Sequence, residues 1–260
     1  MGLMDREQTK CYLFNLEGLT LADLPPCAFN LLSKTELEQC LSFDYEQDQL
    51  VHLCSRVLRR RILGSAMGVP AAALTFTVGA FGKPSVLPAH SMSNNRVEFS
   101  VSHSGHYLAI LMTTNGLCGV DIESPDNSLD TTNILAGTLL SARENDFIVS
   151  ASNRRESLVR FYQVWTLKEA FLKANGEGLS GLEKLDLFEY LDLHSLDGEA
   201  RALSHWPNVT FRVHTSEHYV LSYLVDRDID TLPFIKISPS DSIRIIEGEG
   251  MLAHNFARTH

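Results

Sequence analysis

The sequence lacks several features that would assign it to common protein classes. No apolar run approaches the roughly 18 residues that a membrane-spanning helix needs. The first ten residues, MGLMDREQTK, contain no apolar signal core, and Arg6 stands where a myristoylation motif has Ser or Thr. We therefore expect a cytoplasmic protein without a membrane partner.

Cysteine and positive charge are also scarce. The five cysteines include no Cys-x-x-Cys pair, which argues against a disulfide framework and against a zinc site. The net charge is −10, and nucleic-acid binding needs clustered Lys and Arg, so we expect no nucleic-acid partner. A phosphate-binding GxxxxGK[ST] loop is absent as well.

An internal repeat is present. The segment VEFSVSHSGHYLAI, which starts at Val97, matches VTFRVHTSEHYVLS, which starts at Val209, and each reads as two short strands around a turn. The agreements share an offset of 112: Val97/Val209, Phe99/Phe211, Val101/Val213, Ser104/Ser216, His106/His218 and Tyr107/Tyr219.

Helix-start signals repeat too. The Ser-x-x-Glu capping boxes in LSKTE, from Leu32, and LSARE, from Leu140, differ by 108 positions. The predicted fold is α+β: a pseudo-dimer of two tandem α+β halves, each a long helix on a small antiparallel sheet, with an active site in the cleft between them. We expect an N-terminal half over residues 1–118, a C-terminal half over 119–240 and a polar tail over 241–260.

Charged residues interrupt the apolar helix FYQVWTLKEAFLKANGEGL, which starts at Phe161. Lys168 falls on the apolar stripe of this helix, and Glu169 lies beside it. A buried charge needs a partner, so either the pair faces a ligand or Lys168 forms an internal Lys–Glu pair or extends to the surface. An ion pair between Glu169 and Lys173, one turn apart, is a further alternative.

Two more carboxylates occur in LCGVDIESP. Asp121 and Glu123 point to one face of an extended strand, where they repel each other unless a cation or a proton lies between them. Alone, the pair is weak evidence for a metal site and fits an exposed polar strand face better. With Glu169 as a third oxygen ligand and lysines nearby, the set suits Mg²⁺ bound to substrate phosphates.

The first half contributes polar groups of its own. In FGKPSVLP, Lys83 lies in a rigid Gly–Pro turn. In FSVSHSG, Ser102 and His103 are adjacent in an extended segment, so their side chains point to opposite faces and would make a poor hydrolase triad. Binding of phosphate oxygens is the better interpretation.

Together these motifs carry a family resemblance. GKP, F-x-V-SHS-G, G-V-D-I-E and W-T-x-K-E-A-x-x-K-A-x-G-x-G-L, in this order, resemble the Sfp-type 4′-phosphopantetheinyl transferases over roughly residues 30–238. The resemblance implies Mg²⁺, with Mn²⁺ as an alternative, held by Asp121, Glu123 and Glu169 on coenzyme A. It also implies phosphate neutralisation by Lys168 and Lys173.

The resemblance further implies the contacts to the nucleotide and the reaction. Lys83, Ser102, His103 and Arg56 would hold the nucleotide and its phosphates, although Val51 stands where some members have a basic residue. The reaction would transfer 4′-phosphopantetheine from coenzyme A to a serine of an apo acyl or peptidyl carrier protein, with Glu169 as the nearest base. We expect a monomer. A Mg²⁺-dependent nucleotide or phosphate-ester hydrolase and a non-catalytic coenzyme A-binding paralogue are the alternatives.

Arginines at matching places in the two halves suggest how a carrier would be attracted. Because the chain is itself acidic, steering of an acidic carrier needs a local basic patch. The alternative is that these arginines flank coenzyme A or lie on solvated helix faces. The residues are Arg59, Arg60, Arg61, Arg154, Arg155 and Arg160.

Overall fold

The chain folds into two compact units, each described here by itself. The computed structural model describes residues 9–79, 81–87, 97–114, 116–125, 139–176, 185–191, 193, 209–226 and 232–249. Unit 1 comprises Met1–Thr77, Pro84–Asn115 and Leu232–His260, and unit 2 comprises Val78–Lys83 and Gly116–Thr231. The predicted cleft between the halves stays a prediction.

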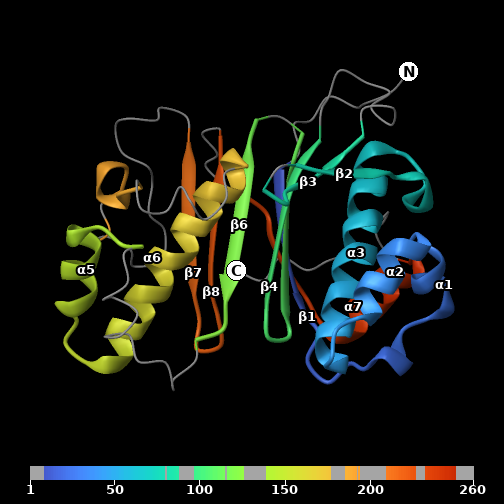
Figure 1. The fold of residues 1–260 in the computed structure, drawn as a ribbon, viewed down its shortest axis with the longest axis horizontal. Coiled ribbons are helices and arrows are strands. Elements are labelled where there is room, and N and C mark those ends of the chain that lie inside the picture. Colours follow the sequence, from blue (N-terminus) through green and yellow to red (C-terminus); the bar gives the residue numbers. More distant parts are fainter. Residues whose placement is uncertain are drawn as a thin grey trace. The chain divides into compact units, whose positions relative to one another are not determined.

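Unit 1 packs a long helix, α3, on a sheet with the strand order β4-β5-β1-β9 (Figure 1). The sheet is antiparallel except that β9 joins β1 in parallel. Its strands are β1 (Thr9–Asn15), β4 (Glu98–Ser104), β5 (Tyr107–Thr113) and β9 (Phe234–Ile237); β2 (Phe76–Val78) pairs with β3 (Pro84–Val86). The helices are η1 (Leu21–Asp23), α1 (Pro26–Asn30), α2 (Lys34–Leu41), α3 (Glu46–Met67), η2 (Ala71–Ala73) and α7 (Pro239–Glu247).

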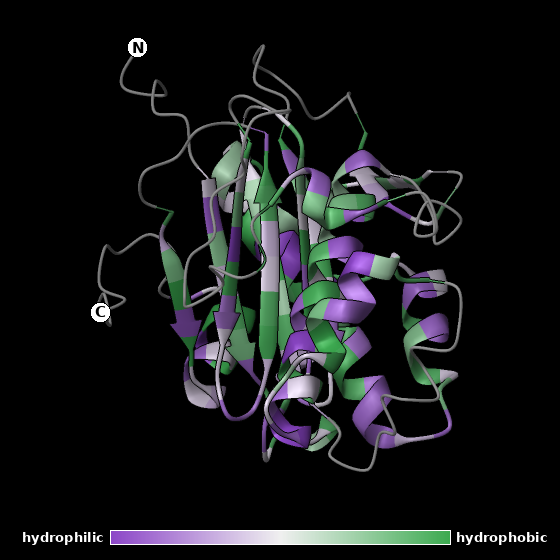
Figure 2. Ribbon diagram, turned by 90° about the vertical axis from the view of Figure 1, so that its left-hand side faces the viewer, coloured by the Kyte–Doolittle hydropathy of each residue, from purple (hydrophilic) through white to green (hydrophobic). Residues whose placement is uncertain are grey.

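Unit 2 repeats the plan with fewer strands. Its helix α6 (Arg154–Asn175) lies across an antiparallel sheet of order β6-β8-β7. The strands are β6 (Cys118–Glu123), β7 (Thr210–Thr215) and β8 (Val220–Val225), and the other helices are α5 (Ala142–Val149) and η5 (Leu187–Glu189). Hydrophilic and hydrophobic residues both occur on the helices (Figure 2), as expected for elements with one buried face, whereas every residue of the inner strands β5 and β8 is buried.

The predicted repeat is confirmed in detail. Helices α3 and α6 each have 22 residues, begin 108 positions apart and end at a left-handed glycine, Gly68 or Gly176. Both predicted capping boxes form, at Ser33 and at Ser141. The hairpins β4–β5 and β7–β8 have the same register, because Glu98 pairs with Thr113 and Thr210 pairs with Val225.

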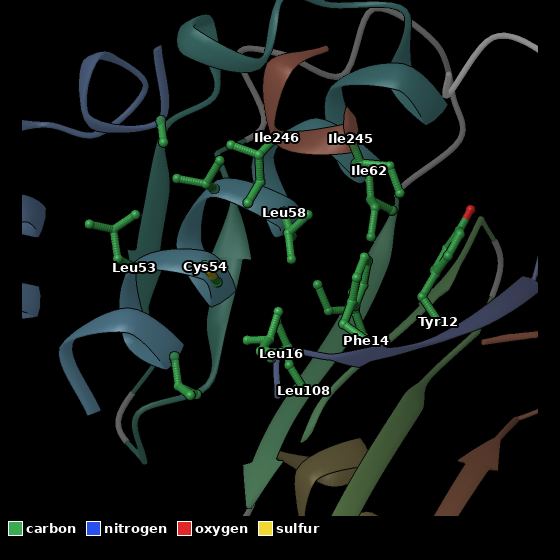
Figure 3. Packing of buried hydrophobic residues seen from close by; sticks show 14 of the residues in the cluster. Tyr12, Phe14, Leu16, Leu53, Cys54, Leu58, Ile62, Leu108, Ile245 and Ile246 are labelled. Atoms are coloured by element: carbon green, nitrogen blue, oxygen red, sulfur yellow. The ribbon is translucent and has the colours of Figure 1, made fainter. Parts of the chain in front are cut away.

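The C-terminal segment differs from the expected polar tail. After β9, residues 239–247 form α7, whose Ile245 and Ile246 are buried in the core of unit 1 beside Leu58 and Ile62 of α3 (Figure 3). The segment has a polar average composition because its few apolar residues are confined to one face of a short helix. Residues 250–260 lie outside the described part of the chain.

The arginine run on α3 does not form the solvated patch that the sequence suggests. The side chains of Arg59 and Arg60 are 11% and 6% exposed and pair with Glu36. Arg61 donates two hydrogen bonds to the Ile246 carbonyl at the end of α7. In unit 2, Arg160 pairs with Glu156. These arginines stabilise helix packing, and only Arg154 and Arg155 of the six are fully on the surface.

No helix in the described ranges combines the length and the apolar character that crossing a bilayer would require.

Candidate active site

Three partly exposed side chains form a row along the second half of α6. Between Phe161 and Ala174 every residue of this helix is buried except Trp165, Glu169 and Lys173, which are only partly covered. These residues recur every four positions, so they lie above one another on the helix surface. The row therefore presents one carboxylate and one ammonium group side by side on a helix that is otherwise held in the core of unit 2.

A glycine lets this helix approach β6 closely. A Cβ atom at Gly119 would lie 1.8 Å from the Ala170 carbonyl oxygen and 2.6 Å from the Ala174 backbone nitrogen. Side chains alternate along a strand, so Asp121 and Glu123 share the face of Gly119. The missing side chain thus brings the two carboxylates of β6 up to the row on α6. The sequence predicts a junction between the halves near this glycine but not its role in helix packing.

Asp121 and Lys173 form an ion pair across the two elements. The Lys173 ammonium donates to Asp121 Oδ1 at 2.6 Å, and the Asp121 side chain is 5% exposed while that of Lys173 is 30% exposed. Instead of the bridge to Glu169 within the helix, which the sequence left as an alternative, Lys173 pairs with a carboxylate of the strand. Burial of the carboxylate makes this a stronger interaction than a surface ion pair.

Glu169 lies in the field of this pair. Burial raises the pKa of its carboxyl group above the usual value; Asp121 and Glu123 raise it further, and Lys173 opposes them. Its Oε1 atom is buried without a hydrogen-bond partner among the residues that the structure describes. A buried oxygen of this kind raises the free energy of the folded protein unless it binds a proton, a water molecule or a cation.

The donor set agrees with the chemistry of Mg²⁺, although the side chains are not arranged as a finished metal site. Asp121, Glu123 and Glu169 offer hard oxygen atoms, and Glu169 Oε1 is buried without a hydrogen-bond partner in the described part of the chain. Over the described ranges, no group of three or more His, Cys, Asp or Glu side chains has a metal-binding arrangement. The Lys173 ammonium supplies the positive charge next to Asp121.

Lys168 does not face a ligand, which corrects the role that the motif suggested. Its side chain is fully buried, and its ammonium donates to Glu144 Oε2 at 2.8 Å and to the Leu185 carbonyl at 2.6 Å. Glu144 also accepts from the Leu187 backbone nitrogen. The internal Lys–Glu pair, left open as an alternative, is what the structure contains, and it fastens the segment before η5 to α5 and α6.

The same device occurs in unit 1. Arg60 donates to Glu36 Oε2 at 2.6 Å and to the Leu74 carbonyl at 2.5 Å. Arg60 and Glu36 precede Lys168 and Glu144 by 108 positions each, the offset of the helices themselves. Sequence reasoning missed this pairing, yet the signal was available, since the capping-box glutamates and the basic residues repeat together.

Lys83 also belongs to unit 2. Its ammonium donates to the Ala174 carbonyl at 3.1 Å and to the Cys118 carbonyl at 3.4 Å. The first acceptor lies in the last turn of α6, where a cation is favoured by the unpaired carbonyls of the helix end. The GKP turn thus brings a second lysine to the part of β6 and α6 that holds Asp121 and Lys173.

The remaining predicted residues lie in unit 1. His103 is exposed on β4, and its ring contacts His52 of α3 at 4.7 Å between centroids. Arg56, one turn further along α3, donates to the His52 carbonyl. Ser102 is buried on the opposite face of β4, as the alternation predicts. His52 was missed because an isolated histidine on a helix gives no signal.

The two units differ most where the carboxylates stand. On the neighbouring strand, Asp121 pairs with Ser222 in unit 2, and Tyr12 pairs with Ile110 in unit 1. Ile110 and Ser222 are equivalent in the repeat, since they lie 112 positions apart, so Tyr12 is the counterpart of Asp121. By the same register, Phe14 of unit 1 occupies the place of Glu123. Unit 1 therefore fills with buried aromatic rings the positions at which unit 2 has acidic groups.

Comparisons with known proteins agree with these motifs. Residues 117–224 match a family model described as the 4′-phosphopantetheinyl transferase superfamily, and residues 25–115 match one described as 4′-phosphopantetheinyl transferase, N-terminal. A Synechocystis protein provisionally named a 4′-phosphopantetheinyl transferase is 33% identical over 154 residues, or 58% of this chain and 59% of that protein.

Two further relatives are more distant. The 4′-phosphopantetheinyl transferase HetI of Nostoc is 27% identical over 158 residues, which cover 60% of this chain and 64% of HetI. A phosphopantetheinyl transferase of Thraustochytrium is 26% identical over 241 residues, 85% of this chain and 80% of that protein. The match thus spans about three fifths of the first two relatives and most of the third.

Proposed function

Because the chain belongs to the 4′-phosphopantetheinyl transferase superfamily, we propose that it transfers 4′-phosphopantetheine from coenzyme A to a serine of an apo acyl or peptidyl carrier protein. The serine hydroxyl attacks the β-phosphate of coenzyme A, the bond from that phosphorus to the α-phosphate oxygen breaks, and 3′,5′-ADP leaves. The observation that carries the proposal is the buried Asp121–Lys173 pair beside Glu169 on the closely packed β6 and α6.

Asp121, Glu123 and Glu169 would hold Mg²⁺. The ion would neutralise charge on the pyrophosphate of coenzyme A. Holding it needs a rigid donor set, and the support for rigidity is the contact of Gly119 with the backbone of α6. Binding of a divalent cation at Asp121 also implies that the Lys173 ammonium moves from its carboxylate towards the phosphate oxygens, since two cations would otherwise share one acceptor.

Glu169 is the base in this proposal. Its pKa is raised by burial and by two neighbouring carboxylates, which makes it a better proton acceptor than a surface glutamate. Lys173, one turn away, would stabilise negative charge that builds on the phosphoryl oxygens in the transition state. Lys168 takes no part in the chemistry; it positions α6, and with it Glu169.

Lys83, Arg56 and His103 would hold the nucleotide part of coenzyme A. Each carries or can accept positive charge, and none of the three is fully buried. Ser102 is the weakest member of the predicted set, because it is 7% exposed and lies on the face of β4 opposite to His103.

Intact-protein mass spectrometry tests the proposal. Several purified apo-carrier proteins are incubated with this protein, coenzyme A and Mg²⁺. We expect a mass gain of one phosphopantetheine on at least one carrier, with release of one equivalent of 3′,5′-ADP. Release of 3′,5′-ADP in the absence of a carrier would favour the hydrolase alternative. Coenzyme A binding without 3′,5′-ADP release, whichever carrier is added, would favour the non-catalytic paralogue.

A further inference from the structure

A column of aromatic rings stands behind His103 in unit 1. The Phe43 ring stacks on the His52 ring at 4.0 Å between centroids and 9° between planes. His52 in turn meets His103 edge to face, at 4.7 Å and 79°. Three rings from the α2–α3 connection, α3 and β4 therefore form one continuous contact that ends at an exposed imidazole.

The base of this column is fixed by the backbone. The Gln49 side chain donates to the Phe43 carbonyl at 2.7 Å and to the Leu41 carbonyl at 3.3 Å, which holds the connection against the first turn of α3. Phe43 is still 36% exposed, so its ring is no ordinary core residue. Its packing partner in the described part of unit 1 is the imidazole of His52.

His52 is held in its neutral form. Burial lowers its pKa to about 4; the nearby His103 and Arg56 lower it as well, and Asp48 acts in the opposite direction. Near neutral pH, His52 therefore contributes a flat uncharged ring and leaves any positive charge to His103 and Arg56. A neutral aromatic neighbour restricts the orientation of an imidazole without competing with it for an anion.

We propose that His52 is a positioning residue whose ring, stacked on Phe43, fixes the imidazole of His103 in the orientation that binds the nucleotide phosphates of coenzyme A. The inference rests on the proposed function, in which His103 contacts the nucleotide. His52 itself touches no phosphate in this account. An orientation fixed in advance removes part of the entropy cost of binding, so its loss weakens affinity.

Calorimetry with coenzyme A as the probe tests the inference on four variants, each compared with wild type. We expect His52→Ala to weaken binding about 3- to 10-fold, the range of an aromatic pair contact. His52→Phe keeps a flat ring at the same place and should retain most of the affinity. In the double variant His52→Ala/His103→Ala, the loss should equal that of His103→Ala alone, because positioning acts only through His103.

Other outcomes overturn the inference. Equal losses in His52→Ala and His52→Phe, or losses that add in the double variant, would mean that a ring nitrogen of His52 binds the ligand directly. Unchanged affinity in His52→Ala would mean that the column is only packing. Circular dichroism and thermal unfolding of each variant confirm that the compared proteins are folded.

A separate measurement distinguishes failure of the inference from failure of the proposed function. If His103→Ala binds coenzyme A normally, the nucleotide role of His103 is wrong and so is the positioning role. The ring-current shift of the His103 C2 proton, measured by NMR without ligand, then separates the causes. A shift that His52→Ala abolishes means that the contact exists but serves no nucleotide, whereas identical spectra mean that the contact itself is absent.

Discussion

Two lysines five positions apart on α6 have opposite environments. Lys168 is fully buried against Glu144, whereas the side chain of Lys173 is 30% exposed beside Asp121. Both belong to the same sequence motif, so the motif alone does not say which of them serves the fold and which serves the chemistry. Their burial does.

Replacement of the two lysines should therefore have different effects. Lys168→Met leaves Glu144 buried without its cation and should lower the free energy of unfolding by about 3–5 kcal/mol. Lys173→Met should cost less, about 1.5–3 kcal/mol, since the Lys173 ammonium is partly solvated although Asp121 is buried, and it should strongly reduce phosphopantetheine transfer. Urea unfolding followed by tryptophan fluorescence measures the first effect, and a transfer assay measures the second.

The matched control is Arg60→Met in unit 1, which breaks the equivalent pair with Glu36 and should be similarly destabilising. A stable Lys168→Met protein that had lost only its activity would contradict the structural role.

His52 gives the protein a pH-dependent stability term. Its folded pKa of about 4 is below the unfolded value of about 6.5, so the unfolded chain takes up a proton that the folded protein refuses. The resulting penalty is absent above pH 6.5 and grows as the pH falls towards 4. Wild type should lose up to about 1.4 kcal/mol per pH unit in this window relative to His52→Phe. Urea unfolding from pH 7 to 4.5 measures the free energy of unfolding of both proteins. A difference between them that does not change with pH would refute the prediction.

At the scale of elements, the site depends on how closely α6 packs on β6. Repeat spacing and apolar periodicity predict both elements and their order. They do not predict the interaxial distance, which is set by the absence of one side chain at Gly119. Nor do they show which side of α6 stays exposed, because that depends on the strands and on α5 packed around it.

Gly119→Ala tests this dependence. The added methyl group overlaps the Ala170 carbonyl, so the helix must shift, at a cost of about 1–3 kcal/mol or more. Because the shift separates Lys173 and Glu169 from Asp121, transfer activity should fall more than the stability change alone explains. Activity is compared at a temperature where the variant is folded. A Gly119→Ala protein as active as wild type would contradict the account.

At the scale of the whole molecule, the two compact units are not two consecutive halves of the chain. The sequence predicts two consecutive halves joined near Gly116–Gly119, whereas unit 2 combines the short segment Val78–Lys83 with Gly116–Thr231. It does not predict that the chain returns to unit 1 through β9 and α7, because the parallel pairing of β9 with β1 joins residues more than 200 positions apart. Non-local pairing of this kind leaves no periodic signal in the sequence.

The return of the chain should matter for stability. Ile245→Ala and Ile246→Ala each remove a buried side chain from the core that α7 shares with α3 and should cost about 2–4 kcal/mol. Arg244→Ala, on the exposed side of the same helix, should cost less than about 0.5 kcal/mol. Thermal or urea unfolding of the full chain gives all three values. Equal stability of the isoleucine and arginine variants would mean that α7 is not part of the folded core.

The most direct test of the central claim is intact-mass analysis of an apo-carrier protein treated with coenzyme A and limiting Mg²⁺ by wild type and by Asp121→Ala. Wild type should add one phosphopantetheine to the carrier. Asp121→Ala should remain folded but transfer at least about 100-fold more slowly, because it removes a charged group from the site of phosphoryl transfer. Transfer by Asp121→Ala at the wild-type rate would contradict the assignment of the β6–α6 site.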